Sequence, residues 1–269
     1  MLVIHNGLLV AVFFVLHVAA AGAQSLDLVN IPRGTAQLGD ARGDKNEVAR
    51  QVEISAFRLM RREVTNLQFA EFVADTGYTT TVENAGKGNV WVKQWGAVVG
   101  ADWRRPQGPD SALHGLGLHP VVQVSAVDAE AFCQHHGLRL PSEVEWEYAA
   151  RGPAGLRYPW GNRLTRSMLP EVTNAGTWSC CAPSKADGYE RTAPVGSFPK
   201  GRSPFGVDDM IGNVWEWTSS PFPGEPGKRA IRGGGWGNNP YCLRAAYRHG
   251  NPPTIGLDMV GFRCAGDLP

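Results

Sequence analysis

Glycine and proline occur throughout the chain beyond residue 23 instead of gathering in one linker. The sequence contains 33 glycines and 19 prolines. Because both residue types interrupt regular helices and strands, this distribution predicts a loop-rich fold. Nine tryptophans and ten phenylalanines supply the large apolar side chains that can hold such loops around a real core.

The first 23 residues are typical of a secretory signal peptide. They contain no Asp, Glu, Lys or Arg, they carry an apolar run at residues 8–18, and they end in Ala-Gly-Ala at 21–23. The run is too short to span a bilayer, and the basic stretch that usually precedes such a run is missing. We therefore expect a periplasmic or secreted protein with no membrane span, in which residues 24–269 form a single domain. The alternative is that the segment stays attached as an uncleaved or lipidated anchor, although no Cys follows the apolar run to accept a lipid.

The charge of the chain argues against a nucleic acid partner. The formal net charge is +1, and no tract rich in Lys or Arg is present. Proteins that bind nucleic acid neutralise phosphates with clustered cations, which this sequence does not provide.

Apolar periodicity predicts an α+β fold whose helices come early. Two capping boxes, one from Thr65 to Gln68 and one from Ser142 to Glu145, mark helix starts. We expect one helix from the Thr65 box to a stop at Gly77, a second at about residues 126–136, and a third from the Ser142 box to near Gly152. Residues 26–40 and 51–63 are expected to form short strands. After residue 155, frequent turn residues predict short strands and no helix longer than a turn or two.

Seven segments carry a resemblance to a known family, and they occur in the order that the family shows. They are EVTN at 63–66, GADWRRPQGPDS at 100–111, HPVV at 119–122, RLPSEVEWEYAARG at 139–152, YPWGN at 158–162, GNVWEW at 212–217 and GFRC at 261–264. Through them, almost all of the chain beyond residue 23 resembles the formylglycine-generating enzymes, also called sulfatase-modifying factors. The resemblance implies an irregular, loop-rich α+β fold related to C-type lectins.

The resemblance also implies two calcium sites, and residue chemistry supports one of them independently. Asp209 and Glu216 bracket a Gly-Asn turn, and calcium prefers carboxylate oxygens joined by backbone carbonyls. The first implied site comprises Asp209, Gly212, Val214 and Glu216. The second implied site comprises Asn174, Ala175, Asp187 and Tyr189. The alternative is that Asp187 and Asp209 only cap turns.

Five cysteines leave an odd one in a protein that we expect to be exported. The resemblance implies a disulfide between Cys133 and Cys264. Cys180 and Cys181 are adjacent, and three arrangements stay open for them: a bond between the two, two free thiols, or a bond from one of them to Cys242.

Cys242 matches the second of two active-site cysteines that bind copper(I) in the family. The first cysteine is absent, since Gly237 stands near its place, and Gly235 replaces an active-site serine. Cuprous ions prefer two thiolates, so the loss argues against the standard two-cysteine copper chemistry. The alternative for Cys242 is an inert buried thiol or a disulfide partner. His249 is the nearest histidine, and we expect it at the surface.

Three further residues match positions that line the family's substrate groove. Arg244 and Arg248 are suited to holding a peptide carboxylate or backbone, and Trp215 would flank the same groove. The alternative for the arginines is a structural ion pair with a glutamate at 143, 145 or 147. The alternative for Trp215 is a place in the core.

Two functions remain, from different classes. The first is an exported oxidoreductase that oxidises or modifies a peptide-like or protein substrate with Cys242 as the catalytic residue, and exported relatives that mature the peptide siderophore pyoverdine provide a precedent. The second is a non-catalytic, calcium-stabilised module that binds a peptide or protein. Retention of Cys242, Arg244 and Arg248 favours the enzyme.

Overall fold

The computed structural model describes residues 26–177 and 182–268. The expected signal peptide at 1–23 lies outside the described residues, and so do Cys180 and Cys181. Within the described part of the chain, no helix has both the length and the apolar character needed to cross a membrane.

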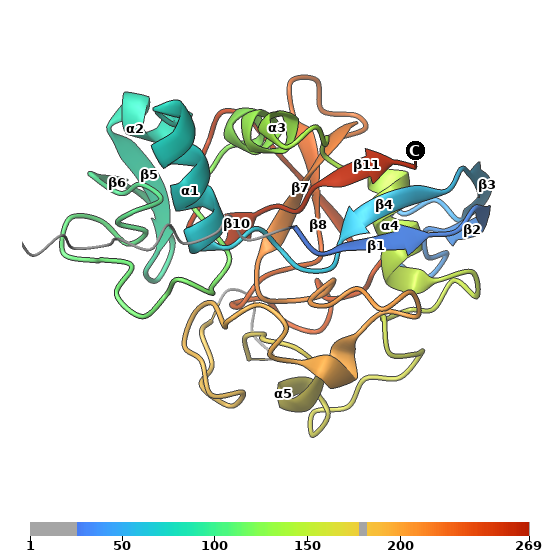
Figure 1. Cartoon of the computed structure of the whole chain (residues 1–269). Coiled ribbons are helices and arrows are strands. Elements are labelled where there is room, and N and C mark those ends of the chain that lie inside the picture. The colour runs from blue at the N-terminus through green and yellow to red at the C-terminus, as the bar shows by residue number, and fades with distance from the viewer. Residues whose placement is uncertain (1–25, 178–181, 269) are drawn as a thin grey trace, which may run out of the picture.

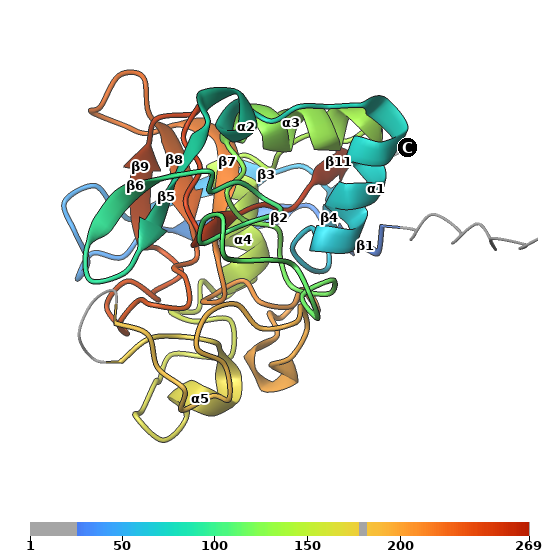
Figure 2. The same ribbon diagram turned by 90° about the vertical axis from the view of Figure 1, so that its left-hand side faces the viewer.

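A four-stranded sheet occupies the centre of the molecule, in the strand order β10-β7-β8-β9 (Figures 1 and 2). Its strands are β7 (Trp215–Pro221), β8 (Arg229–Arg232), β9 (Arg248–Asn251) and β10 (Val260–Gly261). β8 is antiparallel to both β7 and β9, while β10 runs parallel to β7. The register pairs Trp217 with Ile231 and Ile231 with His249, so these side chains share one face of the sheet.

The remaining strands form a three-stranded sheet and two separate hairpins. The sheet has the order β1 (Leu28–Ile31), β4 (Phe57–Met60) and β11 (Ala265–Asp267). The hairpins are β2 (Gly34–Leu38) with β3 (Arg50–Ile54), and β5 (Lys87–Trp91) with β6 (Trp95–Val99). The prediction of short strands within 26–40 and 51–63 is confirmed.

The helices are short, and four of them begin at a capping box. The elements are α1 (Asn66–Thr76), α2 (Thr81–Ala85), α3 (Ala126–His135), α4 (Glu143–Arg151), α5 (Leu169–Val172) and a 3-10 turn η1 (Pro199–Gly201). The three predicted helices are confirmed, as is the absence of longer helices among the described residues after 155. The prediction missed α2, although Thr80 and Glu83 form its capping box, because five residues are too few to show a helical period.

Aromatic side chains join α1, α3 and the C-terminal segment into one core. The ring of Phe132 lies 6.0 Å from that of Phe69 and 5.4 Å from that of Phe262, measured between centroids. The predicted disulfide between Cys133 and Cys264 is confirmed, and both residues are fully buried in this core. It ties α3 to the residue that precedes β11.

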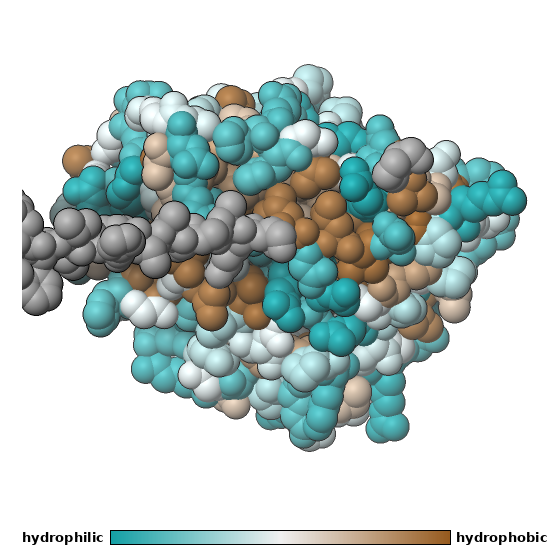
Figure 3. All heavy atoms as spheres, in the orientation of Figure 1, coloured by the Kyte–Doolittle hydropathy of each residue, from teal (hydrophilic) through white to brown (hydrophobic). Residues whose placement is uncertain are grey.

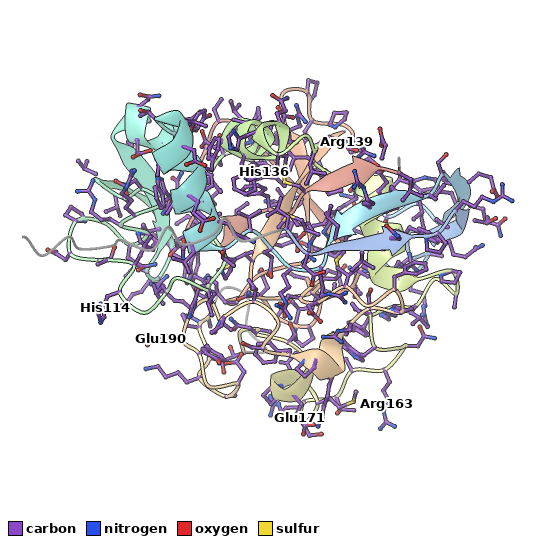
Figure 4. The ribbon with its side chains drawn as sticks, in the orientation of Figure 1. His114, His136, Arg139, Arg163, Glu171 and Glu190 are labelled. Carbon is purple, nitrogen blue, oxygen red and sulfur yellow. A yellow bond between two sulfur atoms is a disulfide. The ribbon has the colours of Figure 1, made fainter. Side chains whose placement is uncertain are left out.

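An ion-pair network joins α4 to β11. Arg139 lies beside β11 (Figure 4), where its guanidinium group donates to Glu145 of α4 and to Asp267 of β11.

The face in Figure 3 carries hydrophilic residues around its margin and hydrophobic residues over β4 and β11. The mixture of short helices, short strands and long loops confirms the α+β class.

Candidate functional site

A cavity of about 420 Å³ lies between the central sheet and the β5–β6 hairpin. Figure 2 shows the hairpin in front of β8 and β9. The sheet contributes Trp215 from β7, Ile231 from β8 and His249 from β9, and the hairpin contributes Trp95. Cys242, from the loop between β8 and β9, completes this part of the wall. The cavity is large enough for a small molecule or a peptide side chain.

Local backbone geometry explains how Cys242 reaches the wall. After β8, Gly233 and Gly234 adopt positive φ angles of 98° and 74°, which glycine tolerates because it has no Cβ. The chain then turns back through Asn238, whose side-chain oxygen accepts from the backbone N–H of Gly235 at 2.8 Å. The backbone N–H of Cys242 donates to the side-chain oxygen of Asn239 at 3.3 Å. Cys242 is 8 % exposed, so it belongs to the cavity wall and not to the solvent.

Aromatic rings surround this part of the cavity. The ring of Trp215 lies 5.9 Å from that of Tyr247 and 6.1 Å from that of His249. Partial burial, with a smaller effect from Lys228, lowers the pKa of His249, so the imidazole is mainly neutral near pH 7. Trp215 lines the cavity and is also part of the hydrophobic core, so its role towards a substrate stays a prediction. His249 is exposed as expected, yet it also lines the cavity.

Arg244 and Arg248 do not line this cavity, contrary to the expectation that they flank Cys242. Arg244 is buried and forms a bidentate ion pair with Glu47, with N–O distances of 2.5 and 2.8 Å. Arg248 donates to Glu143 at 2.7 Å, which is one of the glutamates that the ion-pair alternative named. Both guanidinium groups are therefore committed to carboxylates, and we include neither in the proposed substrate site.

Two residues that the sequence analysis did not single out, Arg191 and Asp258, form an ion pair, and Asp258 lies between the cavity-lining residues Leu257 and Met259 in the chain. Arg191 pairs with Asp258 at 2.5 Å, and its guanidinium carbon lies 4.8 Å from the ring of Trp236. The indole N–H of Trp236 donates to the backbone oxygen of Asp258 at 3.1 Å. Burial raises the pKa of Asp258 to about 7. No motif in the sequence joins residues 191 and 258, so only the structure reveals the pair.

The second implied calcium site brings its residues together around Asp187. The carboxylate of Asp187 accepts from the backbone N–H groups of Ala175 and Tyr189 at 3.1 and 3.0 Å. The side-chain amide of Asn174 donates to the backbone oxygen of Arg191 and to Asn213, while its buried side-chain oxygen accepts no hydrogen bond from the described residues. A buried oxygen acceptor without a donor is costly, and a calcium ion would satisfy it. These residues therefore fit a hard cation held by amide, carboxylate and carbonyl oxygens.

The first implied calcium site has a different environment. Both oxygens of Glu216 accept from Arg263 at 2.7 Å, and one of them also accepts from Trp146. Burial raises the pKa of Asp209 to about 6, and the neighbouring acids Asp208 and Glu216 add to this effect. Gly212 and Val214 lie between them on a buried turn. The carboxylate of Glu216 is thus already neutralised by an arginine, which weakens its fit to a cation.

Glu63 joins this buried acidic group and was missed by the sequence analysis. Burial, followed by repulsion from Asp209, raises its pKa well above the usual value. One of its carboxylate oxygens accepts from Asn213 at 3.1 Å, while the other has no hydrogen-bond partner among the described residues. The EVTN segment contains Glu63, but nothing in that segment indicates that it would face residue 209.

The donors that the cavity offers to copper differ from the pair that the resemblance implies. Cys242, the thioether of Met259 and the imidazole of His249 all line it. Among the described residues, no three His, Cys, Asp or Glu side chains converge in a way that could hold a metal ion. A two-thiolate clamp is not formed by the described residues, so they do not fit the family's copper site, and we assign no step to copper.

Comparisons with known proteins agree with the overall fold. A family model described as the sulfatase-modifying factor enzyme 1-like domain matches residues 17–268. The formylglycine-generating enzyme of Mycobacterium tuberculosis is 39 % identical over 90 % of this chain and 98 % of that protein. The inactive C-alpha-formylglycine-generating enzyme 2 of Bos taurus is 36 % identical over 90 % of this chain and 88 % of that protein. The solved structure of PvdO from Pseudomonas aeruginosa is 25 % identical, with a TM-score of 0.70 over 90 % of this chain and 94 % of PvdO.

Proposed function

Because this chain belongs to the family of sulfatase-modifying factors, or formylglycine-generating enzymes, we propose that it is an exported oxidoreductase that modifies a peptide-like substrate. The observation that carries the proposal is the position of Cys242 in the wall of an aromatic cavity beside the central sheet. In this proposal the reacting group of the substrate enters the cavity and contacts the sulfur of Cys242, while Trp215 packs against it.

Export is supported by two features of the chain. The N-terminal segment has a signal-peptide pattern, and the core contains the Cys133–Cys264 disulfide. Disulfides persist mainly in oxidising compartments outside the cytosol. Expression of the full chain should therefore yield a periplasmic or secreted protein whose N-terminus begins near residue 24, which N-terminal sequencing can check.

Oxidation of the substrate removes two electrons and two protons, and dioxygen, reduced to hydrogen peroxide, is the acceptor that we test first. Purified protein is mixed with a peptide that contains Cys-x-Pro-x-Arg, with and without prior treatment by a thiol reductant, and oxygen uptake is followed. Comparing the two preparations shows whether Cys242 must first be reduced.

Three variants sharpen this experiment. Cys242→Ser is expected to abolish peptide-dependent oxygen uptake in both preparations. Tyr241→Phe, a neighbour that does not line the cavity, is expected to retain it. Trp215→Phe, which keeps a smaller aromatic ring in the wall, is expected to raise KM more than it lowers kcat. Equal uptake by wild type and Cys242→Ser would overturn the catalytic role.

A second candidate function is favoured by a specific observation. The described residues lack a second thiolate in the cavity, and Arg244 and Arg248 are engaged in ion pairs. A relative named as inactive is 36 % identical. The alternative is therefore a non-catalytic peptide- or protein-binding module, which calcium at Asn174, Ala175, Asp187 and Tyr189 would stabilise. Peptide binding measured by calorimetry, without oxygen uptake under any condition, would support it.

A further inference from the structure

The wall around Cys242 is rich in aromatic rings that come from separate elements. Trp95 lies on β6, Trp215 on β7 and His249 on β9, and Tyr247 precedes β9 in the chain. The rings of Tyr247 and His249 are tilted by 47° and 48° against that of Trp215. A planar ring that enters the cavity can therefore stack on one ring and meet the edge of another, and each such contact contributes about 0.5–1.5 kcal/mol beyond burial.

The described residues of the cavity wall also include no acidic side chain, lysine or arginine. The imidazole of His249 is mainly neutral at pH 7 because partial burial lowers its pKa. A charged group placed here would lose its hydration without gaining a partner of opposite charge. The occupant that fits is therefore neutral.

Polar contacts come from side-chain amides. Asn89, Asn238 and Asn251 line the cavity together with the sulfur atoms of Cys242 and Met259. The Asn89 amide N–H already donates to the backbone oxygen of Gly256, and the Asn238 side-chain oxygen accepts from Gly235, so we assign recognition of a hydroxyl or amide substituent to the amide of Asn251. Sulfur makes favourable contacts with ring edges, about 0.3–1.5 kcal/mol each. Both features suit an aromatic ring that carries a neutral polar group.

We propose that the group that enters the cavity beside Cys242 is a neutral, planar aromatic ring bearing a hydroxyl or amide substituent, within a larger peptide-like substrate. This inference rests on the proposed function only in taking the Cys242 cavity as the substrate site. A substrate cysteine side chain alone would leave most of the aromatic wall without a contact.

The test uses the purified mature protein and three small probes, with binding measured by isothermal calorimetry at pH 7. Naphthol is neutral and planar, decahydronaphthol is its saturated counterpart, and trimethylphenylammonium is an aromatic cation. Naphthol is expected to bind at least tenfold more tightly than either of the other two. Equal affinity for naphthol and decahydronaphthol, or tighter binding of the cation, would overturn the inference.

A pair of variants on one strand locates the binding site. Trp95→Leu is expected to weaken naphthol binding about tenfold, because it removes one wall of the cavity. Val99→Ala is the matched control, since Val99 lies on the same strand, is exposed and does not line the cavity, and its affinity should stay within twofold of wild type. Equal effects of the two substitutions would place the naphthol elsewhere and overturn the inference.

Measurements of binding and of turnover distinguish a failure of this inference from a failure of the proposed function. Calorimetry requires no reaction, so naphthol binding without oxygen uptake from any substrate would refute the oxidoreductase and leave the aromatic inference standing. Oxidation of the cysteine peptide by a protein that does not bind naphthol would refute the aromatic inference alone.

Discussion

Asp209 is a buried acid whose protonation reports on any cation nearby. Its pKa is raised to about 6 by burial, against 3.8 for the ordinary side chain. Between these values the folded state holds a proton that the unfolded state has lost, so this group lowers stability as pH rises from about 4 to about 6. The substitution Asp209→Asn replaces the carboxyl group with an uncharged amide and so removes this pH-dependent loss of stability. Above pH 6, in chelator, the variant should be more stable than wild type by roughly 3 kcal/mol.

Thermal unfolding at several pH values checks this prediction. The melting temperature of Asp209→Asn minus that of wild type should be near zero at about pH 4 and should grow up to about pH 6. Added calcium should reduce the difference if Asp209 is a ligand. A difference that does not change with pH would show that Asp209 is not protonated in the folded protein.

Asn174 provides the second test at the scale of single residues. Its buried side-chain oxygen has no hydrogen-bond partner among the described residues, and the residue belongs to the second implied calcium site, so a chelator should lower the melting temperature of wild type by several degrees. Asn174→Ala should abolish this calcium-dependent shift. Asn46→Ala is the control, because Asn46 also has a buried oxygen without a partner among the described residues but lies outside the implied site. An unchanged shift in Asn174→Ala would remove the calcium assignment.

At the scale of elements, α4 begins at a capping box that the sequence predicts. The hydroxyl of Ser142 accepts from the backbone N–H of Glu145 at 3.2 Å and donates to its carboxylate at 2.9 Å. Ser142→Ala should therefore lower the free energy of unfolding by about 1 kcal/mol. Urea denaturation measures the effect, with the exposed Ser167→Ala as control, which should stay within about 0.5 kcal/mol of wild type. Equal losses in both variants would contradict the capping role.

The elements themselves were largely predictable because their signals are local. Capping boxes at Thr65 and Ser142 mark two helix starts, and the structure contains both. Contacts between distant segments were not predictable in the same way. Arg244 and Glu47 are separated by 197 residues. No periodic pattern in the sequence indicates that these two residues pair in the folded protein. Arg244 and Arg248 therefore match groove positions of the family in sequence, but in the structure both form ion pairs with glutamates.

At the scale of the whole molecule, the disulfide closes most of the described chain into one loop. Cys133 and Cys264 are separated by 131 residues. In the chain-entropy model, closing a loop of this length stabilises the folded state by about 4–5 kcal/mol. Cys133→Ala combined with Cys264→Ala should lower the free energy of unfolding by a similar amount, measured by urea denaturation. A loss below about 1 kcal/mol would contradict the structural role of the bond.

The cavity, unlike the disulfide, depends on the assembly of several elements. Trp215 was expected beside Cys242, but the hairpin residue Trp95 and the amide of Asn89 enter the wall only because β5 and β6 fold over the central sheet. Neither residue lies near Cys242 in the sequence, so the chemistry of the wall could be derived only from the fold. This wall is the feature on which the functional account depends.

Mass spectrometry of a peptide library tests that account most directly. The library is incubated under dioxygen with wild type and, in parallel, with Cys242→Ser. The account predicts that some peptides, enriched in those with aromatic side chains, change mass only with wild type. Mass changes of the same size and in the same peptides with both proteins, or with neither, would contradict it.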